Sequence, residues 1–576
     1  TRWCVRSRGL GDVYKRQGLN LAAETVPVEL PPRYYLGNFL SLCDVVENQY
    51  SDVLEPAEAD FIGTFRALPE PAQCLYLRLT SRVGPWFRSR RLGYAEIGDT
   101  GPVLEQLSDA GLVVAAQALD VDELARLFTV AELRGMYAGE TSIPTRGPKP
   151  ELLAALDELA LDAAIIAQRA QDWDGAPIVG PVGDEYMALL QLLFFGNRRQ
   201  DLTEFVLSDL GVFRYVPYPL DRSQRLFPGR DAIEEYRFCG ELSDLYYLWR
   251  EAPEADTLVE LARLIAEAPF VHEASRRRWF RLSNNVARDL ERLEHWDHAI
   301  ALYSDSELHP ARERLARVFE RLEDWVQAES QCLAILENPW CEAEQEAAER
   351  ILQRVRRKAR GERSPRARSR FEERQLSVRR ISGSVERDTA TQLSSDWDEV
   401  HYVENGLFTG LFGLAYWDVI FAPVRGAFNN PFQSAPADMY EQGFRQRRAE
   451  RIAARRAVLT ECDLSAELLG IAGRNRGLQN RWVNWQLLDD ELLASALACI
   501  PRQHLLAVWD RILFDPGENR RGFPDLIAFD VRGSRYQMVE VKGPGDALQD
   551  SQKRWLNFFL QEGLPACVAW VSWVDD

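Results

Sequence analysis

The sequence predicts a multidomain protein with mostly α-helical N-terminal and middle regions and a C-terminal α/β domain. The chain has 576 residues, which suits roughly three or four domains of ~150 residues. Apolar residues recur at helical spacing over much of the N-terminal and middle regions. The last segment, from Gly522 to Trp573, instead has short strand-like runs around one helix.

The composition is typical of soluble globular domains. Hydrophobic residues make up 46% and charged residues 27% of the chain. We find no apolar run of the ~18 residues that a membrane-spanning helix needs, and no secretory signal, so we expect no membrane partner. Residues 1–17 are basic, lack an apolar pattern and do not begin with Met. We expect that segment to be extraneous to the fold.

The cysteines indicate reduced thiols. The nine cysteines are scattered, with no Cys-x-x-Cys pair and no Cys/His cluster at zinc spacing. This pattern is typical of a cytoplasmic protein, and we expect no structural zinc site.

The net charge limits how the chain meets a polyanion. Lys and Arg number 69 against 88 Asp and Glu, a balance of −19, so the overall field repels phosphate. Two basic runs, Arg354–Arg370 and Arg445–Arg456, are local exceptions. They are either solvated helix faces and linkers or phosphate contacts.

Residues 18–118 are predicted to form an N-terminal helical DNA-binding domain. The stretch from Trp86 to Arg91 interleaves aromatic and basic side chains. Such a stretch can stack on bases and neutralise phosphates. It also suits an ordinary helix with one packed face, which is the interpretation that we favour.

Residues 119–165 are predicted to be a helical hairpin. Two apolar helical patterns, over residues 124–133 and 152–159, flank a basic Gly/Pro loop from Ser142 to Lys149. The arrangement resembles a SAP module, which binds the DNA backbone. That resemblance makes Arg146 and Lys149 the phosphate-facing pair. Residues 166–240 are expected to be a helical connecting region.

Residues 241–370 are predicted to be helical repeats followed by a basic linker. Arg292–Ala299 reads RLEHWDHA, and Arg321–Ala328 reads RLEDWVQA. The pattern around the second copy is that of a tetratricopeptide-like hairpin, a unit that must stack on neighbours to close its core. His295 and His298 are close enough on one helix to share a metal, but with no third ligand nearby we interpret them as surface residues.

Residues 371–576 are predicted to form the C-terminal domain. The run Leu526–Phe529 predicts a strand and Arg532–Ser534 a hairpin turn. A second strand over Tyr536–Lys542, a helix over Gln549–Gln561 and a last strand over Cys567–Val571 follow.

Three residues of this hairpin carry the candidate chemistry. Glu540 and Lys542 alternate on one strand and so share a face. Asp525 opens the preceding strand, which brings it close to Glu540. Two carboxylates beside a lysine can hold Mg²⁺ or Mn²⁺ and help to activate a water. The alternative is a solvated surface triad, which the apolar neighbours of Glu540 disfavour.

This order of residues resembles the PD-(D/E)xK nucleases, and the run from Glu540 to Asp546 resembles their VRR-NUC subgroup. The resemblance implies a restriction-endonuclease-like core, with the Val541 carbonyl assisting the metal. It also implies that Glu404, in the run Glu404–Phe408, is a further acidic ligand. Spacing alone does not distinguish Glu404 from Glu399 or Asp418.

A SAP-like hairpin, helical repeats and a C-terminal VRR-NUC domain, in this order, resemble the Fanconi-associated nuclease family. The resemblance implies a structure-selective nuclease (phosphodiesterase I) that cuts 5′ flaps, trims DNA 5′ to 3′ and acts in interstrand crosslink repair. Its partner would be branched or flapped double-stranded DNA with a 5′ end, met at the nucleoid of a bacterial cell. We see no ubiquitin-binding zinc finger of the kind found in animal relatives.

The same resemblance suggests further DNA contacts. A basic pocket for the 5′ phosphate would involve Arg281, helped by His309 or Arg314. Arg520 and Arg521 would touch the scissile backbone. Gln552 is expected to face the site, and Trp555 one turn later to be core.

Two alternative functions stay open. Some stand-alone VRR-NUC proteins are dimeric Holliday-junction resolvases, and dimerisation on DNA is open here too. The long helical portion favours a flap enzyme. A non-catalytic DNA-repair scaffold is the other alternative, and the complete Asp/Glu/Lys set speaks against it.

Overall fold

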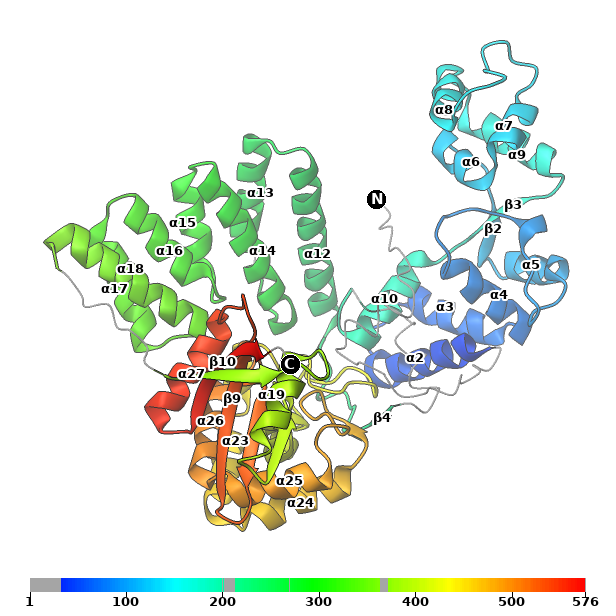
Figure 1. The fold of residues 1–576 in the computed structure, drawn as a ribbon. Coiled ribbons are helices and arrows are strands. Elements are labelled where there is room, and N and C mark those ends of the chain that lie inside the picture. Colours follow the sequence, from blue (N-terminus) through cyan, green and yellow to red (C-terminus); the bar gives the residue numbers. More distant parts are fainter. Residues whose placement is uncertain (1–32, 199, 201–212, 269, 363–370, 575–576) are drawn as a thin grey trace. The chain divides into compact units, whose positions relative to one another are not determined.

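The computed structural model describes residues 33–198, 200, 213–268, 270–362 and 371–574 (Figure 1). The chain divides into two compact units between residues 212 and 213. The predicted extraneous segment, residues 1–17, lies outside the described residues.

The first unit begins with helices packed beside a small sheet. Glu55 and Glu58 form a capping box that starts α3, and Pro56 occupies a first-turn position where its missing N–H is not needed. Phe39 and Phe65 meet edge to face in the core, with ring centroids 4.8 Å apart. The helices are α2 (Tyr34–Tyr50), α3 (Pro56–Ala67), α4 (Glu70–Thr80), η1 (Ser89–Arg91), α5 (Thr100–Asp109) and α10 (Asp184–Phe195).

The sheet of the first unit is antiparallel and has the order β1-β3-β2. Its strands are β1 (Phe87–Arg88), β2 (Val113–Ala115) and β3 (Ile178–Pro181). The aromatic and basic stretch therefore forms a short strand and a 3₁₀ turn, so its interpretation as an ordinary helix is wrong.

The predicted helical hairpin folds as four helices rather than two. They are α6 (Val121–Leu127), α7 (Val130–Met136), α8 (Lys149–Glu158) and α9 (Ala163–Asp174). The first predicted helix is divided because Thr129 and Glu132 form a capping box that starts α7. The helices share one core, to which α9 contributes Ile166 and Ala170. The boundary predicted at residue 165 thus falls inside α9.

The second unit begins with an array of helices (Figure 1). They are α12 (Arg230–Glu251), α13 (Ala255–Glu267), α14 (Glu273–Arg292), α15 (Trp296–Asp305), α16 (Ala311–Arg321), α17 (Trp325–Glu337) and α18 (Glu342–Arg360). The predicted repeat is visible in the backbone. Glu294 and Glu323 hold the same place in the two copies, and both have a left-handed φ, 64° and 62°. Ala299 and Ala328 are fully buried, as the tetratricopeptide-like pattern predicts.

The rest of the second unit is built on a five-stranded mixed sheet of order β5-β10-β9-β8-β6. β10 is parallel to β5 and β9, and β8 is antiparallel to β9 and β6. The strands are β5 (Glu372–Arg379), β6 (Glu399–Tyr402), β8 (Leu526–Asp530), β9 (Arg535–Lys542) and β10 (Ala566–Val574). β4 (Arg214–Tyr215) and β7 (Leu478–Gln479) pair separately.

Each face of this sheet carries its own core. Ile527 and Met538 belong to the larger core, built with the helices that follow β6 and with α27, whereas Val539 and Val541 face α19. Because side chains alternate along a strand, Glu540 projects to the same face as Met538. The helices are α19 (Val385–Leu393), α20 (Gly406–Ala415), α21 (Trp417–Ile420), α22 (Gly443–Arg447), α23 (Ala449–Glu461), α24 (Leu464–Asn475), α25 (Asp490–Cys499), α26 (Arg502–Phe514) and α27 (Asp550–Glu562).

Among the described residues, no single helix is long and apolar enough to cross a membrane. Within the described ranges, one helix pair, α25 with α26, reaches that length and composition, and it is bent by 109° at the break.

Candidate active site

The hairpin β8–β9 brings the predicted carboxylates together. Leu526 pairs with Val539, so Asp525 and Glu540 are the next residues at the same end of the two strands. The Val541 N–H donates to Asp525 Oδ2 at 2.9 Å. Lys542 Nζ lies 2.7 Å from Glu540 Oε1. The three residues predicted from the sequence therefore form one contiguous cluster at the end of the sheet.

The carboxyl group of Glu540 is almost fully excluded from solvent. Its residue is 1% exposed, and Oε2 is buried without a hydrogen-bond partner in the described structure. Burial, and after it the negative charge of Asp525, raise the pKa of the Glu540 carboxyl; the Lys542 ammonium opposes them, and the pKa is raised to about 7. Burial likewise raises the pKa of Asp525, against the Val541 N–H and Lys542. Because the two carboxyls are buried and close together, each holds a proton more tightly than it would in water, and a cation would compete with that proton.

Gln552 holds Glu540 from the helix side. Its Nε2 donates to Glu540 Oε1 at 2.5 Å. Its Oε1 accepts the Gln549 N–H at 2.9 Å, one half of the capping box that starts α27. Because the oxygen is used by the cap, the amide can present only its nitrogen to the carboxylate. Trp555, one turn later on the same helix, is 1% exposed and belongs to the core.

Glu404 reaches the site through strand pairing. β6 pairs with β8, and beyond the last pair the Val403 and Glu404 N–H groups both donate to the Asp525 carbonyl, at 2.9 and 3.0 Å. Glu404 has φ 40°, a left-handed conformation that is unusual for a non-glycine residue. Tyr402 Oη and Asn405 Nδ2 donate to its two carboxylate oxygens at 3.0 and 3.1 Å. Glu404 lies two residues before α20 begins.

A further carboxylate, Glu386, was missed by the sequence analysis. It lies in the first turn of α19, which packs against the sheet, and its charge raises the pKa of Asp525. Ser384 Oγ donates to Glu386 Oε2 at 2.6 Å. The N-cap serine before an acidic residue was the only signal in the sequence, and that pattern starts many helices.

The donor set fits a hard divalent cation. The site offers carboxylate oxygens, which Mg²⁺ and Mn²⁺ prefer, and the unpartnered Glu540 Oε2 is aimed at no protein donor. In the described part of the chain, no three Asp, Glu, His or Cys side chains already lie close enough to hold a metal ion.

The loop before Asp525 is tied to α27. Trp555 Nε1 donates to the Arg521 carbonyl at 2.9 Å, and the Trp555 ring lies against Phe523 with centroids 4.0 Å apart. Arg520 lies over the Tyr440 ring, 4.5 Å from its centroid. Arg521 is exposed, and no acceptor among the described residues lies within hydrogen-bond distance of its guanidinium.

The helical array is anchored beside that loop. Glu342, at the start of α18, accepts from Asn519 Nδ2 at 3.2 Å and pairs with Arg511 at 3.0 Å. Arg554 of α27 lies 3.6 Å from Glu346 of α18. The array and the carboxylate site are therefore joined through the segment that leads into Asp525.

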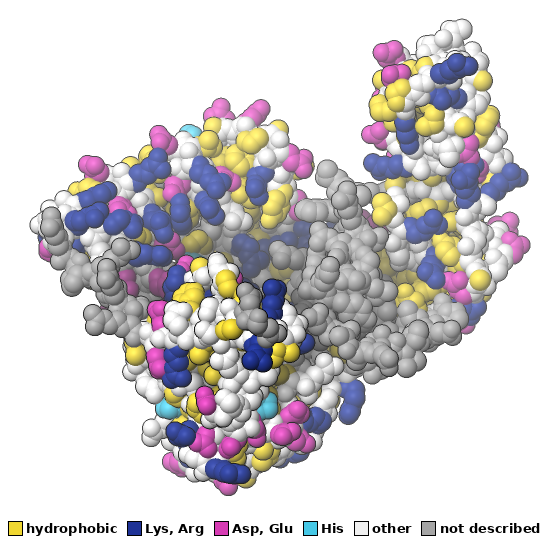
Figure 2. All heavy atoms as spheres, in the orientation of Figure 1, with side chains coloured by type: hydrophobic (Ala, Val, Ile, Leu, Met, Phe, Trp, Pro, Cys, Tyr) yellow, Lys and Arg dark blue, Asp and Glu magenta, His cyan; other side chains and the backbone are white. Residues whose placement is uncertain are grey.

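The predicted phosphate-pocket residues have different surroundings. Arg281 is on the exposed face of α14. His309 is half-buried, and its Nδ1 has no partner in the described structure. Arg314 is held by Glu291, with Nε 3.0 Å from Oε2. Figure 2 shows many Lys and Arg side chains, with carboxylates among them, over the array.

Most of the described arginines in the two basic runs pair with carboxylates of the protein, and phosphate contact by these runs stays a prediction. Arg448 is 1% exposed and bound to Asp438 at 2.6 Å. The other pairs are Arg455 with Glu467, Arg456 with Asp510, Arg354 with Glu320, and Arg356 and Arg360 with Glu329. Residues 363–370 lie outside the described residues.

In the predicted SAP-like module, Arg146 is exposed on the loop between α7 and α8. Lys149 Nζ donates to the Ala125 carbonyl at 2.8 Å. Arg134, which the sequence analysis did not single out, holds the loop by donating to the Pro144 and Gly147 carbonyls at 3.1 and 2.6 Å.

Family models match three parts of the chain. They are the FAN1 HTH domain over residues 33–114, the Fanconi anemia-associated nuclease SAP domain over 118–173 and the VRR-NUC domain over 463–573. The last match includes Asp525, Glu540 and Lys542, whereas Glu404 and Glu386 lie before it.

Curated relatives match along most of the chain. It is 37% identical to the Fanconi-associated nuclease 1 homolog of Pseudomonas aeruginosa, over 96% of this chain and 99% of that protein. It is 25% identical to the Arabidopsis thaliana homolog over 93% of this chain and 67% of that protein. For Fanconi-associated nuclease 1 of Homo sapiens the values are 23%, 91% and 61%.

Two solved structures share the fold. A crystal structure of paFAN1 bound to 2nt 5′flap DNA with gap has a TM-score of 0.79 and 35% identity, covering 96% of this chain and 100% of that one. Another, of paFAN1 bound to 1nt 5′flap DNA with gap, has a TM-score of 0.76 and 34% identity, covering 95% and 100%.

Proposed function

Because the chain belongs to the Fanconi-associated nuclease family, we propose that it is a divalent-metal-dependent nuclease that cuts DNA at 5′ flaps. The cluster of Asp525, Glu540 and Lys542 at the end of β8 and β9 is the observation that carries the proposal. The solved relatives bound to 5′flap DNA support the choice of substrate. Trimming from 5′ to 3′ and a role in interstrand crosslink repair are part of the same proposal.

Asp525, Glu540 and Glu404, with the Val541 carbonyl, are the groups that would hold Mg²⁺ or Mn²⁺. A bound ion of this kind polarises the scissile phosphate and lowers the pKa of a coordinated water. Gln552 keeps the Glu540 carboxylate oriented toward the site through its 2.5 Å hydrogen bond. The N–H groups of Val403 and Glu404 fix the backbone of Asp525.

Lys542 acts on the attacking water and on the phosphate. Its side chain is 10% exposed and its Nζ lies at the carboxylate cluster. A cation held there orients the water for in-line attack and offsets the negative charge that develops on the phosphate.

The DNA is held on both sides of the site. Arg520 and Arg521 contact the backbone beside the scissile bond, because their loop leads directly into Asp525. Arg281 and His309 of the helical array receive the 5′ end. Arg314 takes a positioning role in that pocket, since Glu291 already binds its guanidinium.

Cleavage of a labelled 5′-flap duplex with Mg²⁺ or Mn²⁺ tests the proposal. We expect cutting near the flap junction by the unaltered chain and a loss of about a hundredfold or more in Asp525→Asn. Asp530→Asn is the matched control, because Asp530 ends the same strand and pairs with Arg535 rather than with the site. That variant is expected to cut normally.

The substrates also separate the alternatives. Faster cutting of a four-way junction than of the flap would identify a Holliday-junction resolvase. DNA binding without cutting of any substrate, unchanged in Asp525→Asn, would identify a scaffold and overturn the proposal.

A further inference from the structure

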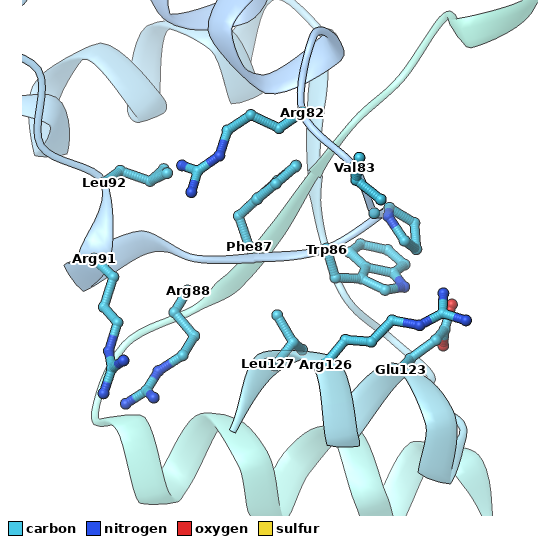
Figure 3. Close-up of a pocket in the computed structure, with 12 residues that line it drawn as sticks. Arg82, Val83, Trp86, Phe87, Arg88, Arg91, Leu92, Glu123, Arg126 and Leu127 are labelled. Carbon is cyan, nitrogen blue, oxygen red and sulfur yellow. The ribbon is translucent and has the colours of Figure 1, made fainter. Parts of the chain in front are cut away.

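A cavity of about 210 Å³ lies within the first unit. It opens between the turn that follows α4 and helix α6 (Figure 3), where the segment matched as an HTH domain meets the segment matched as a SAP domain. Its lining includes Arg82, Val83, Trp86, Phe87, Arg126 and Leu127. The aromatic and basic stretch of the sequence therefore forms a wall of this cavity.

The fold holds Trp86 in a fixed position. A Cβ at Gly180 of β3 would lie 2.4 Å from the Pro85 carbonyl oxygen and 2.8 Å from the Trp86 ring. The indole therefore rests directly on bare backbone, which only glycine permits there. The ring is half-buried, and Arg126 extends beside it in Figure 3. The cavity thus has a rigid aromatic surface.

The cavity also has an excess of positive charge. Four arginines line it, with Glu123 as the one carboxylate among the lining residues. Arg88 is neutralised by Asp174 and by Glu132 at 2.7 Å, and Arg91 pairs with the same Glu132 at 2.8 Å. The remaining two arginines, Arg82 and Arg126, have no carboxylate partner among the described residues.

Arg82 and Arg126 keep their charge available. Both are exposed, and within the described ranges no carboxylate oxygen lies within 4.0 Å of either guanidinium. Arg82 donates to the neutral Tyr94 hydroxyl at 3.0 Å. The Arg126 guanidinium lies beside the Trp86 indole, whereas the Arg82 guanidinium lies over the Phe87 ring, 5.4 Å from its centroid (Figure 3).

We propose that this cavity binds one unpaired nucleotide of a single-stranded DNA arm. Its base stacks on Trp86, and the neighbouring phosphates contact Arg82 and Arg126. A tryptophan face stacks on any base, and arginine matches phosphate geometry, so the site reads strandedness rather than sequence. Bases of a fully paired duplex are not available to the indole. The inference rests on the proposed function for DNA as the ligand, but it does not involve the carboxylate site.

The test is binding of the full chain, in EDTA, to a labelled duplex with a single-stranded arm and to the blunt duplex of the same length. Trp86→Ala is expected to weaken binding of the armed duplex about tenfold, the loss from one stacked base, and to change the blunt duplex by less than about twofold. Trp86→Phe should keep most of the affinity. Trp173→Ala, at another partly exposed tryptophan of the same unit, is the matched control and should bind normally.

Arg126→Gln protects the test against misfolding of Trp86→Ala, because Arg126 is an exposed helix residue. It should weaken binding of the armed duplex about threefold and reduce the salt dependence by about one counterion. A 2-aminopurine base placed along the arm should be quenched at one position, and the quenching should be lost in Trp86→Ala.

Equal losses on armed and blunt duplexes, normal binding by both Trp86→Ala and Arg126→Gln, or no quenched position would each overturn the inference. So would a free deoxynucleoside monophosphate that competes as well as the arm does. Because these measurements exclude metal, failure of the chain to cut flaps would overturn the proposed function alone.

Discussion

At the residue scale, the burial of the Glu540 carboxylate favours binding of a cation beside it. An ionised carboxylate with 1% exposure is unfavourable unless a partner compensates it. Lys542 and Gln552 compensate one of its oxygens and leave the other without a partner. Burial is the main reason why the pKa rises to about 7. In the absence of metal, a proton is therefore the competing ligand.

The raised pKa predicts a metal requirement that depends on pH. Below about 7 Glu540 is protonated, so a cation must displace the proton. We expect the Mg²⁺ concentration for half-maximal flap cleavage to rise about tenfold from pH 7 to pH 6, and less from pH 8 to pH 7. DNA binding in EDTA over the same range is the control. A constant metal requirement from pH 6 to pH 8 would contradict the assignment of Glu540 as a metal ligand.

The same shift has a defined sign for stability. The unfolded chain releases the Glu540 proton near 4.5, whereas the folded chain keeps it up to about 7. The metal-free protein therefore loses stability from this group as the pH rises through that window, and it recovers the loss when a cation binds.

At the element scale, the hairpin and its neighbours were predictable because their signals are local. Apolar runs and a Gly-containing turn gave β8 and β9, and helical spacing gave α27. β5 was missed because its sequence, EERQLSVR, is mostly polar, as suits an edge strand. β6 was missed because four residues carry too little pattern.

The residues of the site also divide into those that a local pattern predicts and those that it does not. Asp525, Glu540 and Lys542 lie on one hairpin, so their spacing brought them together. Glu404 came only from a family resemblance, and Glu386 was not found. Both lie on distant segments that β6 pairing and α19 packing bring to the hairpin, and no local pattern encodes those contacts.

Gly522 sets the path of the backbone that leads into Asp525. It has φ 87°, and a Cβ there would lie 2.6 Å from the Ser551 carbonyl carbon at the start of α27. We expect Gly522→Ala to lower the free energy of unfolding by about 2–4 kcal/mol, through strain and overpacking together, and to reduce cleavage at least about tenfold.

Gly545→Ala is the matched control for that prediction. Gly545 has φ 92° but no atom within 4 Å of an added Cβ, so the cost should be only about 1 kcal/mol. Urea denaturation compares the two variants. Equal costs would show that contact with α27 does not position the loop.

At the scale of the whole molecule, many basic side chains form ion pairs with carboxylates of the protein itself. The chain carries −19, and most of the described arginines in the two basic runs are bound to carboxylates. DNA affinity must therefore come from a few arginines that are not already paired, and it should fall steeply with salt.

A matched pair of arginines tests this distribution. Arg521→Gln should weaken binding to the flap duplex and reduce the slope of log affinity against log salt by about one. Arg456→Gln should leave that slope unchanged, because Asp510 already neutralises Arg456 at 2.9 Å. The slopes are measured by fluorescence anisotropy across a salt series. Equal slopes for the two variants would show that Arg456 contacts DNA.

The place of β10 in the sheet has a consequence for synthesis of the chain on the ribosome. The hairpin β8–β9 is complete at Lys542, but β10 lies between β5 and β9 and ends at Val574. Until those last residues emerge, β5 has no neighbour in the sheet and β9 has an open edge. A nascent or prematurely terminated chain therefore carries the proposed catalytic residues without the complete sheet that supports them.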